Sequence, residues 1–318
     1  MLEQKVLITG YTGFIGNALL PHFSKSSLVL IGRQDAPSTY GSVYCKRLDA
    51  SEQFCDCLEN VSVIVHCAAR VHIINDKACS TITAFKDVNT FGTLNLARQA
   101  ASAGVKRFIF VSSIKVNGES TSEYTPFYFN DNFYPRDPYG ASKAEAEIEL
   151  KKLAIETGME VVIIRPTLVY GPGVKANFAS LMNLVSKGIP LPFGSITQNK
   201  RSLVSINNLV DLIVTCIDHP KAANQVFLVS DDHDVSTSEM VRELAIALGK
   251  PTWQLPVPIW CYKLFGKLFG KSDIVDRLTG SLQVDISHTK ETLGWKPPQT
   301  LQEGFKQTAQ AFLQANNK

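Results

Sequence analysis

The sequence has no apolar stretch long enough to span a lipid bilayer, and its charge is close to balanced. A net charge of +3 over 318 residues is too small to indicate a nucleic-acid partner. The N-terminus enters an apolar strand-like run by Lys5, which leaves no room for a signal peptide. We therefore expect a cytoplasmic globular protein of one large or two modest domains.

The seven cysteines form no C-x-x-C pair and show no regular spacing. An odd, irregular set fits unpaired thiols in a reducing compartment and excludes the disulfide framework of a small secreted domain. His66 and His72 flank a single loop in which the sequence offers no third ligand. A metal site is therefore not expected.

Strand-like apolar runs alternate with helical patterns through the first half of the chain. Strands are expected at 5–9, 28–32, 43–47, 61–66, 107–112 and 160–165, and helices at 17–23, from 49, at 85–103 and at 139–157. Such alternation is typical of parallel strands joined by crossover helices that cover both faces of the sheet. The sequence therefore predicts an α/β, Rossmann-type doubly wound parallel sheet.

After Pro166 the pattern loosens and prolines separate shorter elements. Helices are expected at 177–187, 207–219, 236–249 and 301–315, with a strand at 225–229. We interpret residues 1–166 as a dinucleotide-binding domain and 167–318 as mainly a smaller, mixed α/β substrate-binding lobe, with some segments returning to the first domain. Residues 260–271 are amphipathic and basic, which fits a membrane-surface helix or, as we prefer, a helix packed on this lobe.

The first strand runs into a turn in which Gly10, Gly13 and Gly16 are spaced G-x-x-G-x-x-G. The first glycine permits a tight turn, the second lets the backbone approach a pyrophosphate, and the third lets helix and strand pack closely. Amide groups at the start of the following helix would face the phosphates. This pattern predicts a dinucleotide site.

A second motif, far downstream, points to redox chemistry. Tyr139 and Lys143 are four residues apart in an expected helix and so share one face, and Ser113 ends an expected strand. A nearby ammonium should lower the pKa of the Tyr139 phenol and suit it as the general acid/base of a hydride transfer. The Ser113 hydroxyl can hold the reacting oxygen against it.

With these motifs in place, the chain resembles the extended short-chain dehydrogenases/reductases that act on nucleotide sugars. The resemblance covers nearly the whole chain and is carried by Thr9-Gly10-x-x-Gly13-x-x-Gly16, Leu48-Asp49, His66-Cys67-Ala68-Ala69, Asn89, Val111-Ser112-Ser113, Tyr139-x-x-x-Lys143, Arg165-Pro166, Val169-Tyr170-Gly171-Pro172-Gly173, Arg201 to Leu209, and Leu293-Gly294-Trp295.

The resemblance implies contacts for both ligands. The residues implied for the cofactor, beyond the three glycines, are Phe14 and Ile15 at the pyrophosphate, Asp49 and Ala50 at the adenine, Cys67, Ala68, Ala69 and Asn89 along the cofactor, Lys143 and Tyr139 at the nicotinamide ribose, and Pro166 and Thr167 at the nicotinamide. The residues implied for a uridine diphosphate are Asn177, Phe193, Arg201 and Arg277. Arginines suit a diphosphate and an aromatic ring suits uracil.

Departures from the family pattern narrow the activity. Ile114 and Lys115 follow Ser113 where dehydratases of this superfamily carry an Asp-Glu pair, so the groups for water elimination are missing. Gly32-Arg33 ends the second strand where NAD-specific members usually carry an acid. Arg33 suits a 2′-phosphate, so NADP(H) is expected beside NAD(H). Leu168 replaces an asparagine that many relatives use near the sugar.

These features predict hydride transfer at C4 of a UDP-linked hexose or acetamido-hexose. We favour a 4-keto reductase of surface polysaccharide synthesis, because Arg33 suggests NADPH. The alternative is a UDP-glucose or UDP-GlcNAc 4-epimerase that keeps its cofactor, and a remote third is a non-catalytic NADP-sensing protein. A homodimer is also expected.

Overall fold

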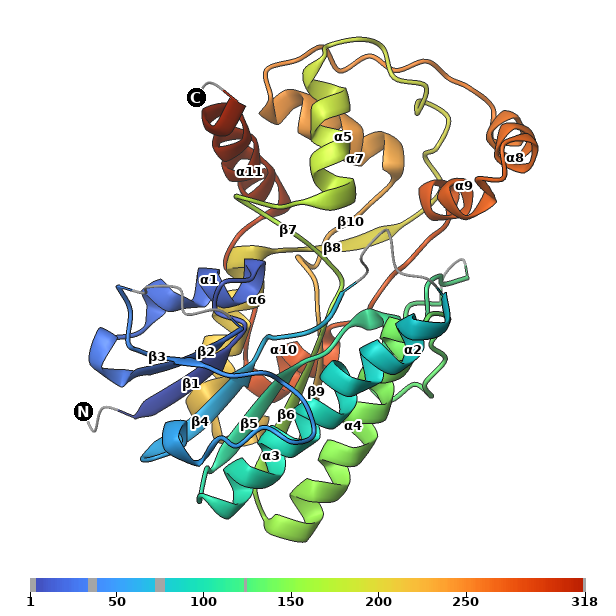
Figure 1. Cartoon of the computed structure of the whole chain (residues 1–318). Helices are drawn as coiled ribbons and strands as arrows, with labels where there is room; N and C mark the ends of the chain where they lie inside the picture. Colours follow the sequence, from blue (N-terminus) through green and yellow to red (C-terminus); the bar gives the residue numbers. More distant parts are fainter. Residues whose placement is uncertain (1–3, 34–38, 72–77, 123–124, 317–318) are drawn as a thin grey trace.

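The computed structural model describes residues 4–33, 39–71, 78–122 and 125–316, which form two lobes (Figure 1). The first lobe contains a seven-stranded sheet whose paired strands are all parallel, in the order β3-β2-β1-β4-β5-β6-β9. Its strands are β1 (Lys5–Thr9), β2 (Leu28–Gly32), β3 (Ser42–Cys45), β4 (Val61–His66), β5 (Arg107–Val111), β6 (Glu160–Pro166) and β9 (Val226–Val229). The predicted doubly wound parallel sheet is confirmed.

Helices cover both faces of this sheet, which explains why its strands are continuously apolar. One face carries α3 (Thr93–Ser102) and α4 (Pro138–Thr157), and the other carries α1 (Phe14–Leu19), α6 (Ile206–Asp218) and α10 (Ser287–Leu293) (Figure 1). Neighbouring residues of β1 divide between the two cores: Val6 and Ile8 pack on the side of α1 and α6, and Leu7 packs on the side of α3 and α4.

Two local predictions were wrong. No helix starts at residue 49, where the chain forms turns and then a 3₁₀-helix, η3 (Cys55–Cys57). The helix expected over 85–103 is instead α2 (Ala78–Lys86), a π-helical segment η4 (Asp87–Gly92) and α3. The turn of η4 presents Gly92 to the backbone of Leu48, where a Cβ atom would lie 2.5 Å from the carbonyl oxygen. The missing helix at 49 and the π-helical segment η4 therefore lie where the 48–52 loop and η4 contact each other, and this tertiary contact accompanies both departures from local helical propensity.

The second lobe is built on a three-stranded sheet in the order β10-β8-β7. Its elements are β7 (Leu168–Tyr170), β8 (Arg201–Ser205), β10 (Asp234–Val235), α5 (Ala176–Ser186), α7 (Thr237–Ala247), α8 (Ile259–Leu268), α9 (Ser272–Thr279) and α11 (Leu301–Asn316). Ser236 and Glu239 form a capping box at the start of α7. The remaining short 3₁₀-helices are η1 (Leu20–His22), η2 (Lys25–Ser27), η5 (Ile114–Val116) and η6 (Pro220–Ala222).

Segments of the second half of the chain return to the first lobe. Strand β9 pairs with β6 at the edge of the large sheet, and α6 packs against the same sheet. Among the described residues, no helix is both long and apolar enough to cross a membrane.

Candidate functional site

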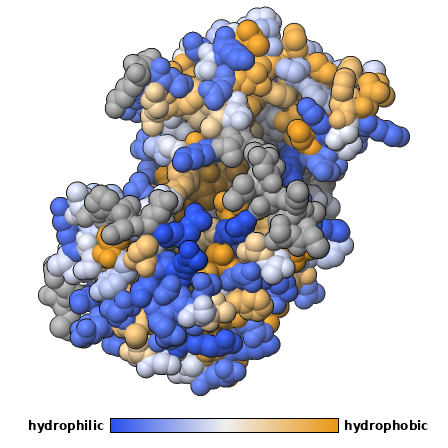
Figure 2. Space-filling model, in the orientation of Figure 1, coloured by the Kyte–Doolittle hydropathy of each residue, from blue (hydrophilic) through white to orange (hydrophobic). Residues whose placement is uncertain are grey.

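A hollow separates the two lobes, above the ends of the parallel strands (Figure 2). The glycine turn after β1, the loop after β4, the Ser112-Ser113 end of β5 and the start of α4 all lie on this side. Ligands of open α/β sheets bind at the carboxyl ends of the strands. These segments therefore form the candidate site.

The glycine turn forms the geometry expected of a dinucleotide cradle. Gly10 has φ +68° and donates its N–H to the carbonyl of Ile31, 3.1 Å away. A Cβ atom at Gly10 would lie 2.8 Å from the backbone of Ala68, and one at Gly16 would lie 2.3 Å from the carbonyl oxygen of Gly10. Helix α1 begins at Phe14, so the amides of Phe14 and Ile15 are among the first of the helix, which lack intrahelical acceptors. Gly13 provides the N-cap of this helix, with an extended backbone.

Gly16→Ala is therefore expected to weaken NAD binding by about 5- to 150-fold. The added methyl would meet backbone atoms of the turn that shapes the pyrophosphate site, and such overpacking costs about 1–3 kcal/mol. Titration of NAD against the variant and the parent, followed by tryptophan fluorescence, measures the change. Gly104→Ala is the control for backbone strain outside the turn, because Gly104 has φ +82° and lies between α3 and the start of β5. Equal NAD affinity of parent and Gly16→Ala would contradict this role.

Buried polar groups fix the loop that follows β4. His66 bonds Thr9 Oγ1 through Nδ1 and Thr93 Oγ1 through Nε2, both at 3.0 Å. The Thr9 hydroxyl also accepts the N–H of Ala68 at 3.2 Å. Burial and the charge of Lys143 lower the pKa of His66 to about 3, so this histidine is neutral. His66 supports the cofactor loop, and His72 lies outside the described residues.

Asn89 holds the same loop from η4. Its Oδ1 accepts the N–H of Arg70 at 2.8 Å, and its Nδ2 donates to the carbonyl of Arg70 and to Ser142 Oγ, both at 3.0 Å. Both amide hydrogens thus have protein acceptors, and Asn89 is buried. These bonds position the loop that contains Cys67, Ala68 and Ala69, and the contact with the cofactor implied for Asn89 stays a prediction. Desolvation raises the pKa of the Cys67 thiol to about 12, so it is uncharged there.

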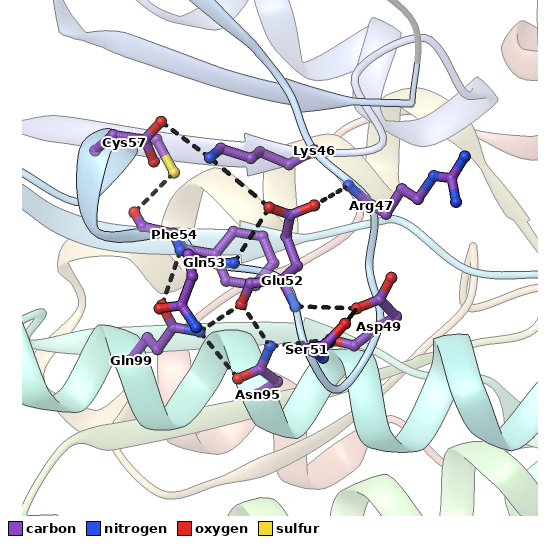
Figure 3. A network of polar contacts seen from close by, with 11 residues as sticks. Lys46, Arg47, Asp49, Ser51, Glu52, Gln53, Phe54, Cys57, Asn95 and Gln99 are labelled. Atoms are coloured by element: carbon purple, nitrogen blue, oxygen red, sulfur yellow. Dashed lines mark hydrogen bonds and ion pairs between the residues drawn. The ribbon is translucent and has the colours of Figure 1, made fainter.

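The loop expected to border the adenine is held by a polar network (Figure 3). Asp49 Oδ1 accepts the N–H groups of Ser51 and Glu52 at 2.9 and 3.0 Å, and these bonds lower the pKa of Asp49. From α3, Asn95 Nδ2 donates to the carbonyls of Asp49 and Glu52, each at 2.9 Å. This network explains why the residues after Asp49 form turns. Ala50 stays exposed to solvent in this loop.

Arg33 is exposed just beyond β2, and its carbonyl accepts a hydrogen bond from Cys45 Sγ at 3.5 Å. Residues 34–38, which include Asp35, lie outside the described part of the chain. A guanidinium–phosphate contact at this position therefore stays a prediction.

The three candidate catalytic residues come from two adjoining elements. Asp137 caps α4 by accepting the N–H of Gly140 at 2.6 Å, which places Tyr139 in the first turn and Lys143 in the next. The buried Lys143 ammonium donates to the carbonyl of Val111 at 2.9 Å and lies 4.3 Å from the ring centroid of Phe110. Lys143 is thus bonded to the last residue of β5, two positions before Ser113. An ammonium has three donors, so two are available to a ribose.

The Tyr139 side chain is half-buried and packs edge-on against Phe85, with ring centroids 6.2 Å apart. Burial, with the charge of Asp137 adding to it, raises the pKa of Tyr139 to about 12. The expected lowering by Lys143 was therefore wrong for the protein without ligand, because desolvation of the phenol dominates. Burial also lowers the pKa of Lys143 to about 8, opposed by Cys67 and Glu147.

The segment after Ser113 is tied to the start of α4. The N–H of Lys115 donates to Ser113 Oγ at 3.3 Å, and its ammonium pairs with Asp137 and, at 3.2 Å, with Glu119. A Cβ at Gly140 would lie 2.8 Å from the carbonyl oxygen of Lys115, so glycine permits this close approach. Lys115 thus stands as an ion-paired cation where dehydratases use an acid.

Sequence reasoning missed a buried ion pair behind the catalytic residues. Arg165, at the end of β6, pairs with Glu147 of α4 through Nη2 at 2.6 Å, and both side chains are at most 1% exposed. Glu147 also accepts the Ser112 hydroxyl, and Arg165 Nη1 donates to Asn117 Oδ1 at 3.0 Å. The pair therefore joins α4, the end of β5 and the loop that follows it. Arg165 next to Pro166 was visible in the sequence, but nothing in the sequence around Glu147 marked it as the buried partner of Arg165.

Pro166 and Thr167 are buried at the end of β6, and the Thr167 hydroxyl donates to the carbonyl of Val229 at 3.3 Å. Leu168 is 44% exposed beside them. A nicotinamide contact by Pro166 and Thr167 stays a prediction, since it depends on their backbone and methyl surfaces.

Two of the residues expected to bind a uridine diphosphate are brought together. Arg201 Nη1 donates to the carbonyl of Arg277 at 2.7 Å. Burial, with the charge of Arg277 adding to it, lowers the pKa of Arg201. Within the described part of the chain, the ion pairs include neither guanidinium. Arg201 thus contacts the backbone of Arg277, and arginine side chains that no described carboxylate pairs with are suited to a diphosphate.

The other two residues are placed differently. Phe193 is only 9% exposed and belongs to the apolar core of the second lobe, with Leu191 and Ile196. Its ring was expected to stack on uracil, and core packing instead occupies most of its surface. Asn177 lies in α5, and its side chain is outside the described part of the structure.

The parallel sheet, the glycine turn after β1 and the Tyr-x-x-x-Lys pair are together typical of the extended short-chain dehydrogenases/reductases. The chain belongs to the NAD dependent epimerase/dehydratase family, whose pattern matches residues 6–230. It is an NAD-dependent enzyme of the extended short-chain dehydrogenase/reductase class. The glycine cradle fits this cofactor, because Cβ atoms at Gly10 and Gly16 would obstruct its turn.

Two relatives align along nearly the full length of the chain. The chain is 69% identical over 321 residues to a UDP-glucose 4-epimerase of Vibrio cholerae, covering 100% of this chain and 98% of the relative. It is 26% identical to the N-acetyl-alpha-D-glucosaminyl-diphospho-ditrans,octacis-undecaprenol 4-epimerase of Escherichia coli O157:H7, covering 97% of this chain and 95% of the relative. The solved UDP-glucose 4-epimerase of Thermotoga maritima has the same fold, with a TM-score of 0.76, 20% identity, and coverage of 98% and 100%.

The identity of 69% to an epimerase over the whole chain overturns the 4-keto reductase interpretation. That interpretation depended on Arg33 and Leu168, both exposed side chains. Exposed positions tolerate substitution with little effect on a buried site, so they carried too little information about the reaction.

Proposed function

We propose that this protein is a UDP-glucose 4-epimerase that interconverts UDP-glucose and its C4 epimer, UDP-galactose. The observation that carries the proposal is the 69% identity along the entire chain to an epimerase, together with the intact Ser113, Tyr139 and Lys143 set. The paired Arg201 and Arg277 support binding of the diphosphate.

The residues have distinct parts in the proposed reaction. Tyr139 takes the proton of the sugar 4-hydroxyl on oxidation and returns it to the 4-oxygen on reduction. Ser113 holds that oxygen, and the Lys143 charge stabilises the phenolate formed on Tyr139. NAD, which the turn at Gly10, Gly13 and Gly16 would hold, would supply the acceptor and donor of the C4 hydride. The second-lobe arginines hold the diphosphate while the hexose turns, so that either face of C4 can meet the cofactor.

The test is to supply UDP-glucose to the purified protein and to separate the products by chromatography. We expect UDP-galactose to form until equilibrium, with no net change at the absorbance band of reduced nicotinamide, because each cycle regenerates NAD. The reverse reaction from UDP-galactose should reach the same ratio. UDP-xylose, which lacks C6, is an informative comparison for the hexose pocket. Absence of interconversion by NAD-loaded protein would refute the proposal.

The other expected properties follow from this role. We propose a cytoplasmic enzyme, which the six free cysteines among the described residues support, since free thiols are typical of a reducing compartment. The homodimer stays a prediction, which sedimentation of the purified protein can check.

A further inference from the structure

We propose that the exposed face of α8 docks this protein on an anionic lipid surface. The face consists of large apolar side chains that the fold leaves in solvent: Trp260 (64% exposed), Leu264 (56%), Phe265 (55%), Leu268 (72%) and Phe269 (66%). Figure 2 shows apolar side chains gathered at the edge of the second lobe where Figure 1 places α8 and α9. So many large apolar side chains in one short segment indicate an interaction surface.

The helix is fixed in this orientation by its opposite side. Gly266 is buried, and a Cβ there would lie 2.7 Å from Val275 Cγ2 of α9. Tyr262, one turn before Gly266, and Ile259, two turns before it, are half-buried on the same side. The expected packing on the lobe therefore uses a narrow stripe, and the remaining apolar surface faces outward.

The charged residues beside the exposed face of α8 indicate which partner binds there. Lys263 and Lys267 are four residues apart in α8, beside the row of Trp260, Leu264 and Leu268. Lys271 follows in the turn between α8 and α9, and residues 259–271 contain no acid. In α9, Asp273 and Asp276 stand with Arg277, so the basic groups prevail over the two helices. Aromatic and leucine side chains flanked by lysines are typical of helices that lie in a bilayer interface, with the ammonium groups at lipid phosphates.

A second copy of the chain fits this face less well. A two-fold symmetric dimer uses the same face of both copies, so it would gather three lysine ammonium groups from each copy at one interface, while residues 259–271 supply no acid to pair with them. An anionic bilayer neutralises all three ammonium groups while its acyl region receives the apolar side chains. The helix would lie on the membrane, which is consistent with the described helices being unable to span it.

The experiment is flotation of the purified full-length protein with vesicles. We expect binding to phosphatidylcholine vesicles that contain phosphatidylglycerol, little binding to phosphatidylcholine alone, and weaker binding as salt rises. The double variant Lys263→Gln/Lys267→Gln should bind the mixed vesicles about 30-fold more weakly at low salt, since each lysine contributes about 1 kcal/mol near such a surface. Leu264→Ser/Leu268→Ser should weaken binding by at least about tenfold.

Ile246→Ser is the matched control, because Ile246 of α7 is 57% exposed and lies outside the α8 face. It should bind vesicles like the parent, and all variants should keep the epimerase activity and thermal midpoint of the parent in solution. The proposal is overturned if the parent does not float with mixed vesicles, or if the α8 variants bind as well as Ile246→Ser. It is also overturned if those variants change the sedimentation coefficient of the protein, which would assign the face to a second copy.

Discussion

Tyr139→Phe is expected to lower turnover by about 10²–10⁴-fold, the usual contribution of a positioned general acid/base. The variant keeps the ring that packs against Phe85 and loses only the hydroxyl, so folding and NAD binding should be unchanged. The rate of UDP-glucose interconversion at saturating substrate measures the loss.

The structure supplies a matched control and a graded comparison. Tyr134→Phe removes the same atom from a tyrosine that is 58% exposed, and it should leave turnover within about twofold of the parent. Ser113→Ala should cost less than Tyr139→Phe, because Ser113 orients the oxygen and does not carry the proton. Near-parental turnover in Tyr139→Phe would remove Tyr139 from the mechanism.

The cofactor half of the site was predictable because its signals are local. The turn at Gly10 needs a positive φ angle, and the close contact at Gly16 excludes a side chain, so both requirements are written directly as glycine in the sequence. The helix that carries Tyr139 and Lys143 is likewise set by neighbouring residues, with a capping aspartate and a proline at its start. At the glycine turn and at the start of α4, the geometry of neighbouring residues determines which residue type can occupy the position.

The features that sequence reasoning missed depend on distant contacts. The turns after Asp49 are stabilised by Asn95, which follows 46 positions later, and no local pattern reveals that partner. Phe193 reads equally well as a ring for uracil or as a core residue, and only the assembled second lobe shows its packing. The pKa of Tyr139 depends on burial, which the Tyr-x-x-x-Lys spacing does not contain.

The reaction itself was least accessible to this reasoning. A reductase and an epimerase need the same Ser113, Tyr139 and Lys143, and they differ in whether oxidised cofactor leaves and whether the ketosugar can turn. Those differences depend on the shape of the space between the lobes and on cofactor release, which no short motif encodes. Similarity along the whole chain integrates these constraints, which is why it outweighed the exposed Arg33.

Glu147→Gln is expected to destabilise the fold by about 3–5 kcal/mol, the cost of leaving a buried partner charge unpaired. The substitution keeps the size of the side chain, while Arg165 stays 1% exposed and loses the carboxylate that two of its nitrogens contact. The hydrogen bond from Ser112 is weakened at the same time. Denaturant unfolding at a fixed NAD concentration measures the change in the free energy of unfolding through the midpoint.

Two variants separate the buried charge from other effects of the substitution. Glu149→Gln, which removes the partner of Lys152 on the exposed side of the same helix, should cost less than about 1 kcal/mol. Glu147→Leu combined with Arg165→Met removes both charges, and it should recover much of the lost stability because no unpaired ion remains. The recovered protein should still epimerise more slowly than the parent, since the pair also holds Asn117 and the loop after β5 beside Ser113. A loss in Glu147→Gln no greater than in Glu149→Gln would show that the pair does not stabilise this part of the site.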